Sequence, residues 1–271
     1  MRVECGGVVR TGRVVDARDL DVSRADAVAA VRGDAAPVTV DCPDPGLAHE
    51  RVGDVHPEMA VSTRAVLAVA ARSRGQTAPE DDRIAEVESK LAELTVPAAS
   101  TRSAREAVAE QAEEVERLDE RVAELRGRVQ VLRERDAETA DVEAELAAAM
   151  RDLTDVRTDL IAAREAHEAA TEAARTARDA RERRMELEDR LANLRRAARA
   201  SLADAVADAY RDAVAAAPWT TPTDPFEAGD VTTALAAARI ADLRAPVVLS
   251  CDRFADPATA ADWLEAAVLR L

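Results

Sequence analysis

The stretch that decides the fold is VAEQAEEVERLDERVAELRGRVQVL, residues 108–132. Its apolar residues recur at alternating intervals of three and four, with Val at one recurring position and Leu at the other. The series, which has one polar member, is Val108, Gln111, Val115, Leu118, Val122, Leu125, Val129 and Leu132. This heptad pattern predicts an α-helix that packs along one stripe against a second helix.

The same pattern resumes after Asp136 and mirrors the first series. Its members are Val142, Leu146, Ala149, Leu153, Val156, Leu160, Ala163, His167 and Ala170. When Leu132 is set opposite Val142 and Leu118 opposite Val156, the two position numbers of every pair add to nearly the same total. A constant total is what two antiparallel limbs require, so we expect an antiparallel coiled-coil hairpin with its tip near residues 136–139. His167 falls on the seam, where we expect a tolerated polar residue.

The ends and the interruption of the hairpin are also visible. Pro79 precedes three acidic residues, and both features favour a helix start. Pro97 lies in the segment 95–100 and lacks a backbone donor, so the ascending limb is expected to break there. The return limb is expected to be one continuous helix from about residue 140 to 216, which Pro218 ends. The hairpin is thus expected to occupy residues 79–217.

The two chain ends, residues 1–78 and 218–271, are expected to form one small α/β base domain. Short apolar runs predict strands at 2–5, 8–10, 13–15, 38–42, 246–251 and 268–271. Helices are expected from Ser23 to Gly33 and over 65–74, 232–243 and 257–265, and residues 43–57 are expected to be a loop. The predicted fold class is therefore mainly α, with the hairpin inserted in an α/β base made by both termini.

Composition restricts where the protein works. The formal net charge is −16, which repels phosphate, so broad nucleic-acid binding is not supported. No signal peptide and no apolar run long enough for a bilayer is present. The three cysteines are an odd number, as is usual for reduced proteins. We expect a cytoplasmic protein without a membrane segment.

Motifs for catalysis or cofactor binding are missing from the sequence, so no cofactor and no catalytic residue is expected. The one cluster of potential metal ligands is the loop 42–56, with Cys42, Asp44, His49 and His56 as weak zinc candidates. Their spacing matches no common zinc template, and a structural loop built on turn-forming Pro and Gly is the alternative interpretation.

Four arginines near the expected tip form a second candidate site. Arg126, Arg128, Arg133 and Arg135 make this end of the hairpin less acidic than the rest. They are candidates for docking a partner. The alternative is ordinary charge alternation on a solvated helix.

Two resemblances to known families follow from particular residues. Lys90 is the single lysine of the chain, and acidic excess with Arg in place of Lys resembles haloarchaeal proteins. Together with the loop 42–56 and the segment 65–79, this composition makes the chain resemble the coiled-coil proteins of halophilic archaea, a family without an assigned activity. That resemblance implies a source and no function.

The second resemblance covers residues 227–236 and 246–257, which are similar to the tail half of SMC-type ATPase heads. Asp252 stands at the catalytic acid of that family, but Cys251 replaces its magnesium-binding Asp and Ala228 its signature Ser. No phosphate loop is present. The resemblance therefore implies a relic that has lost nucleotide hydrolysis.

These observations predict a non-enzymatic coiled-coil scaffold or protein-interaction module, with a protein partner or self-association. A degenerate SMC-like chromosome-associated protein without ATP hydrolysis is one alternative. A metal-dependent activity at the 42–56 loop is another.

Overall fold

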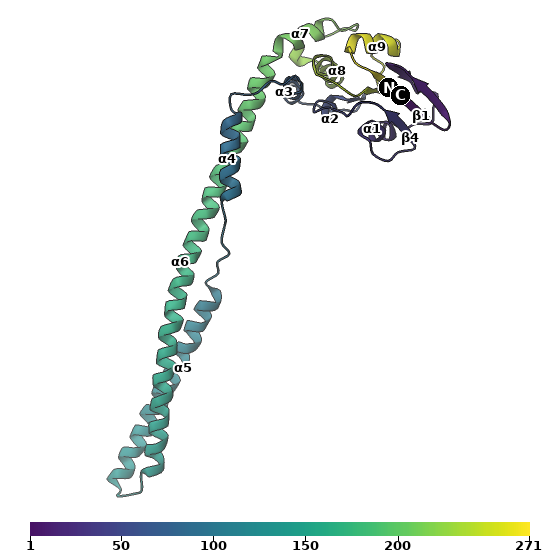
Figure 1. The fold of residues 1–271 in the computed structure, drawn as a ribbon. Coiled ribbons are helices and arrows are strands. Elements are labelled where there is room, and N and C mark those ends of the chain that lie inside the picture. Colours follow the sequence, from purple (N-terminus) through teal and green to yellow (C-terminus); the bar gives the residue numbers. More distant parts are fainter. The chain divides into compact units, whose positions relative to one another are not determined.

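The computed structural model describes all 271 residues, and the chain is mainly helical with two small sheets (Figure 1). It divides into two compact units. The base unit comprises Met1–Val87 and Arg190–Leu271, and the arm unit comprises Glu88–Asp189. The division falls inside the helices α4 (Asp81–Glu93) and α6 (Ala140–Ala205), whereas the sequence placed the hairpin ends at residues 79 and 217.

The first sheet of the base unit is antiparallel and has the order β2-β1-β4. Its strands are β1 (Arg2–Cys5), β2 (Val8–Thr11) and β4 (Val38–Asp41). Gly6 and Gly7, both with positive φ, close the β1–β2 hairpin with a two-residue turn, a backbone shape that favours glycine.

The second sheet is parallel and has the order β3-β7-β6-β5. Its strands are β3 (Val14–Asp16), β5 (Asp54–Val55), β6 (Val247–Leu249) and β7 (Val268–Arg270). Alternate residues point to opposite faces, so Val247 and Leu249 join one apolar core while Val248 joins the other. Both faces are therefore covered, as is usual for parallel sheets.

Helices supply the covering layers of the base unit. They are α1 (Arg24–Arg32), α2 (His49–Val52), α3 (Thr63–Ser73), α7 (Ala207–Ala215), α8 (Asp230–Ile240) and α9 (Pro257–Leu264), with a 3-10 turn at Pro225–Glu227. The predicted ends of α1 are confirmed, because the Ser23 hydroxyl accepts from the Asp26 N–H and Gly33 ends the helix at φ 82°. Helix α1 and the antiparallel sheet enclose one core, and α3, α7, α8 and α9 enclose the other.

Helix α8 is the centre of the larger core. Residues 232–238 are all buried, and the helix contacts α2, α3, α7, α9 and β5. A helix that is apolar on every side must be buried on every side. Because five of its buried residues are Ala or Leu, neighbouring elements approach it closely.

All five aromatic residues of the chain lie in the base unit. The Trp219 ring lies 5.2 Å from that of Phe254 and 5.4 Å from that of Trp263, centroid to centroid. Tyr210 packs against Phe226 at 5.3 Å. Tryptophan fluorescence consequently reports on the base unit alone.

The arm unit contains the rest of α4, the helix α5 (Arg102–Glu134) and the first part of α6. Figure 1 shows α5 running beside α6, and seam residues of both helices form one apolar cluster. Its buried members are Leu118, Val122, Leu125 and Val129 from α5 and Val142, Ala149 and Leu153 from α6. Arg157 of α6 also donates two hydrogen bonds to the Asp119 carboxylate, at 2.8 and 2.9 Å.

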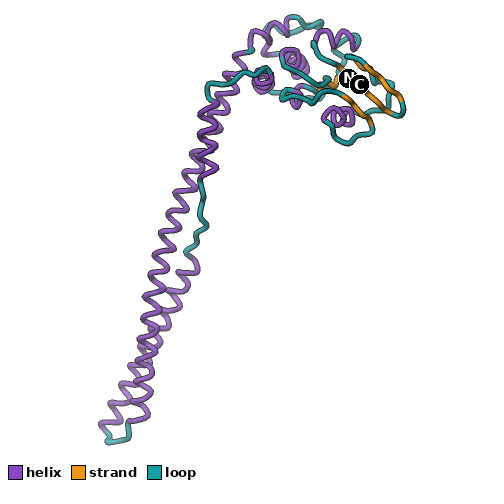
Figure 2. The backbone as a smooth tube through the Cα atoms, in the orientation of Figure 1, coloured by secondary structure: helices purple, strands orange, loops and turns teal.

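Two segments of the arm unit are not helical. Residues 94–101, which contain Pro97, separate α4 from α5 and appear as a loop in Figure 2. Residues 135–139 link α5 to α6, and Asp136 adopts a positive φ of 53° there. A short Asp side chain tolerates this left-handed backbone better than most.

Two sequence expectations about secondary structure were wrong. The predicted loop 43–57 contains α2 and β5. Strand β5 has two residues and forms because it pairs with β6. A local sequence pattern cannot predict this contact, because β6 is distant in the sequence. The predicted continuous return helix is interrupted at Val206, whose N–H bonds to the Ala203 carbonyl, and this turn separates α6 from α7. Tyr210, Ala213 and Val214 of α7 are buried in the base core, so tertiary packing outweighs helix propensity at Val206.

Replacing Leu125 by Ala should destabilise the arm unit selectively. Leu125 is 1 % exposed within the arm cluster, and emptying such a site costs ~2–5 kcal/mol. Far-ultraviolet circular dichroism should show earlier thermal loss of helix, while the transition in tryptophan emission stays in place. Val131→Ala on the same helix, where the side chain is 44 % exposed, is the control and should change neither signal. Equal effects of the two variants would contradict the seam assignment.

Candidate functional site

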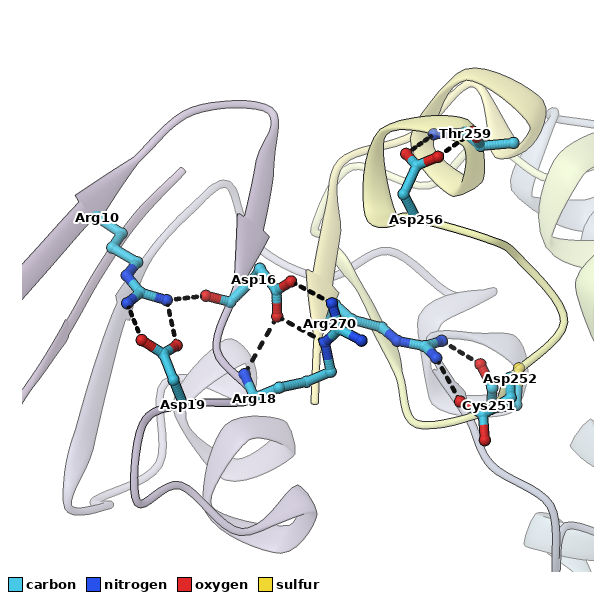
Figure 3. A network of polar contacts seen from close by, with 9 residues as sticks. All are labelled: Arg10, Asp16, Arg18, Asp19, Cys251, Asp252, Asp256, Thr259 and Arg270. Carbon is cyan, nitrogen blue, oxygen red and sulfur yellow. Dashed lines mark hydrogen bonds and ion pairs between the residues drawn. The ribbon is translucent and has the colours of Figure 1, made fainter.

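The carboxyl ends of the parallel strands carry a network of polar contacts (Figure 3). Open α/β sheets commonly bind ligands outside this edge, which makes it the first place to examine. Strand β3 ends at Asp16, β7 ends at Arg270, and Asp252 lies in the segment that follows β6.

Arg270 is the most buried charged group of this network, with a side chain 6 % exposed. Its Nη1 donates to the Cys251 carbonyl, and its Nη2 donates to Asp252 Oδ1 at 2.7 Å. A buried guanidinium is tolerated when its donors are satisfied. Arg270 therefore ties the end of β7 to the segment after β6.

The neighbouring segment after β3 holds two more ion pairs. Arg18 donates to both oxygens of Asp16, at 2.9 and 2.6 Å, and Arg10 donates to both oxygens of Asp19, at 2.7 and 2.5 Å. The arginine hydrogen bonds lower the pKa of Asp16 and of Asp19. Each cation of the network already has a carboxylate within the chain, and each pair joins residues of the same chain end: Arg10 with Asp19, Arg18 with Asp16, and Arg270 with Asp252. The observed geometry therefore fastens local segments at this edge of the sheet.

The candidate metal ligands of the 42–56 loop do not come together. The Cys42 thiol donates to the Val31 carbonyl at 3.9 Å, and burial raises the pKa of this thiol. His56 Nδ1 lies 3.2 Å from a Glu58 oxygen, and Asp44 is exposed. The structure contains no group of three or more His, Cys, Asp or Glu side chains placed to hold a metal ion.

His49 is instead an internal link between α2 and the parallel sheet. It is 2 % exposed, and its Nε2 lies 2.8 Å from the Pro246 carbonyl, just before β6. Because a carbonyl only accepts, Nε2 carries a proton and donates it to Pro246. The ring lies flat against Gly53, where an added Cβ would sit 2.4 Å from His49 Cγ. Burial lowers the pKa of His49.

The four arginines near the tip fall into two groups. Arg133 donates to Glu143 at 2.7 Å, and Arg128 lies 3.9 Å from Glu145. Arg126 and Arg135 are exposed and make no ion pair. Arg126 and Arg133 line a shallow groove of about 580 Å³ above Val129 and Leu146.

The sequence reasoning missed the Arg270 network. One signal was present, since an arginine stood inside an otherwise apolar predicted strand at 268–271. The partners of Arg270 could not be identified from the sequence, because Cys251 and Asp252 become its neighbours only when β6 lies beside β7.

The fold defines a mainly helical protein with a small α/β unit built from both chain ends. The chain belongs to the family of unknown function DUF7856, whose model matches residues 12–268. No curated protein and no solved structure matches it. Its similarity to SMC-type ATPase heads and to proteins of halophilic archaea stays a prediction from the sequence. None of its helices combines the length and the apolar character needed to cross a membrane.

Replacing Gly53 by Ala should destabilise the base unit by ~1–3 kcal/mol, because the new methyl group displaces the His49 ring and breaks its bond to Pro246. Urea unfolding followed by tryptophan emission measures this. Gly127→Ala in the arm unit is the control for a Gly→Ala exchange without steric conflict, since no atom lies within 4 Å of its added Cβ, and it should leave the transition in tryptophan emission in place. A neutral Gly53→Ala would show that the His49 ring is not held in this position.

Stability should fall between neutral pH and about pH 5, with His49 contributing part of the change. Its pKa in the folded state is lowered from 6.5, so the unfolded chain takes up the proton first as the pH falls. The contribution is fully present above pH 6.5 and is lost as the pH falls toward the folded pKa. His49→Gln keeps a donor for Pro246 but does not titrate, so it should flatten the dependence of Tm on pH.

Proposed function

We propose that this chain is a coiled-coil scaffold or protein-interaction module that works without catalysis and binds a protein partner through its arm. In this proposal α5 and the first part of α6 form an antiparallel coiled-coil hairpin. The observation that carries it is the apolar cluster drawn from both helices at the mirrored heptad positions.

The ion pairs between the two helices support the antiparallel arrangement. Asp119 pairs with Arg157, and Arg133 pairs with Glu143. The step from 119 to 133 on α5 equals the step from 157 back to 143 on α6. Equal and opposite steps are the signature of antiparallel helices.

The surface of the arm unit carries exposed apolar side chains as well as charged ones. Val131 and Met150 are each 44 % exposed, and Ile161 is 56 % exposed. The tip groove adds an apolar floor beneath Arg126, which has no ion pair in the chain. Exposed apolar side chains beside an unpaired cation favour contact with another protein.

Affinity capture from extracts of the native cells, at native salt, tests this proposal. The intact chain should retain a protein in stoichiometric amount. Arg126→Glu combined with Arg135→Glu should reduce that retention about tenfold or more, because both cations would become repulsive to the same partner. Helicity should not change, since both side chains are exposed.

Arg105→Glu is the matched control, because Arg105 lies on the same helix far from the tip and also makes no ion pair. It should retain the partner fully. Light scattering reports in parallel whether the partner is a second copy of the chain. If the wild-type chain retains nothing in stoichiometric amount and remains monomeric, the arm is not an interaction module.

A further inference from the structure

A groove of about 660 Å³ lies within the base unit, between α3 and the last part of α6. Its floor is apolar and made mostly of small side chains. The floor residues are Ala65, Ala68, Val69, Ile84, Ala198 and Leu202. Small residues on both facing helices leave space between them that larger side chains would have filled.

Cations line both walls of this groove. Arg51 stands on the α2 wall, and Arg195 and Arg199 stand one helical turn apart on the α6 wall. Residues at this spacing project to the same side of a helix. Arg51 and Arg199 are exposed and make no ion pair in the chain. Glu50 is the one acidic residue of the lining.

Another arginine of the lining, Arg72, is paired within the chain. Arg72 of α3 donates to both oxygens of Asp81, at 2.8 and 2.5 Å, and is thereby neutralised within the chain. In a chain of net charge −16, the two unpaired arginines Arg51 and Arg199 beside an apolar floor oppose the overall surface charge.

Leu47 adds an exposed apolar contact at the mouth of the groove. It precedes α2, lines the groove beside Arg51, and is 68 % exposed. An exposed leucine next to an apolar groove with charged walls is the arrangement expected of a contact site that a partner completes.

We propose that this groove binds an amphipathic helix of a partner protein, with apolar side chains on the floor and carboxylates facing Arg51 and Arg199. The occupant is helical because the walls are helices, with no open strand edge to pair with an extended backbone. It is acidic on its flanks because the groove is cationic. This site goes beyond the arm, since every residue of the groove belongs to the base unit.

Selection from a phage-displayed library of amphipathic helices tests the proposal on the full chain. The apolar positions are fixed at i, i+3, i+4 and i+7, and the flanking positions are random. The selected peptides should be enriched in Glu and Asp on their flanks. Fluorescence anisotropy should show binding weakened about tenfold or more by Arg51→Glu with Arg199→Glu, and weakened also by Leu47→Ser and by added salt.

Arg196→Glu is the matched control, because Arg196 lies on the same helix outside the groove and should leave the affinity unchanged. Tryptophan emission and circular dichroism verify that each variant is folded. Selection of basic flanks, indifference to the groove variants, or failure to select any peptide would overturn the proposal. It would also be overturned if the same variants abolished binding to phosphatidylglycerol vesicles or dissociated a dimer, since lipid or a second copy would then be the occupant.

Discussion

The pairing of β3 with β7 is the contact on which the rest of the structure depends, because it joins Val14 to Val268. In the order β3-β7-β6-β5, the N-terminal part of the chain supplies both outer strands and the C-terminal part supplies both inner strands. Neither part can form the sheet alone. The nearly 200 residues between β5 and β6 must therefore leave the sheet and return to it. The long helices α5 and α6 belong to this intervening segment. Closing a long insertion costs little more conformational entropy than closing a shorter one.

The base unit achieves burial with small side chains. Only 2 % of the residues are aromatic, so the core around α8 is built from Ala, Val and Leu that allow close approach of helix to helix and of helix to sheet. The few aromatic residues gather where α7, α8 and α9 meet the segment 219–226. Val206 interrupts the return helix at the point where α7 must turn its apolar side into that core.

The arginines discussed above fall into two groups, according to whether a carboxylate of the same chain pairs with them. At the carboxyl edge of the parallel sheet, Arg10, Arg18 and Arg270 each pair with a carboxylate of the same chain end, and these pairs fix the segments around strands β3, β6 and β7. Arg126 and Arg135 at the tip of the arm, and Arg51 and Arg199 at the groove beside α3, make no ion pair in the chain. The first group stabilises the fold, and the second group carries the two binding proposals.

The sequence by itself determined the helices of the arm, because a seam that repeats every seven residues is a local pattern and survives in any tertiary setting. It also determined α1, through the cap at Ser23 and the glycine at Gly33. Only the tertiary structure decided β5, which pairs with a strand about 190 positions away, and the break at Val206, which depends on the core as a whole. It also decided the pairing of Arg270 with Asp252, which requires β6 and β7 to lie side by side. The same holds for the sites. The sequence suggested His49 as a metal ligand in a loop, whereas the structure shows that it bonds to Pro246 and links α2 to the sheet. Arg51 and Arg199 are far apart in the sequence and line the same groove only because the helices pack together. The sequence determines the chemistry of each side chain, whereas long-range packing determines its neighbours and therefore its role.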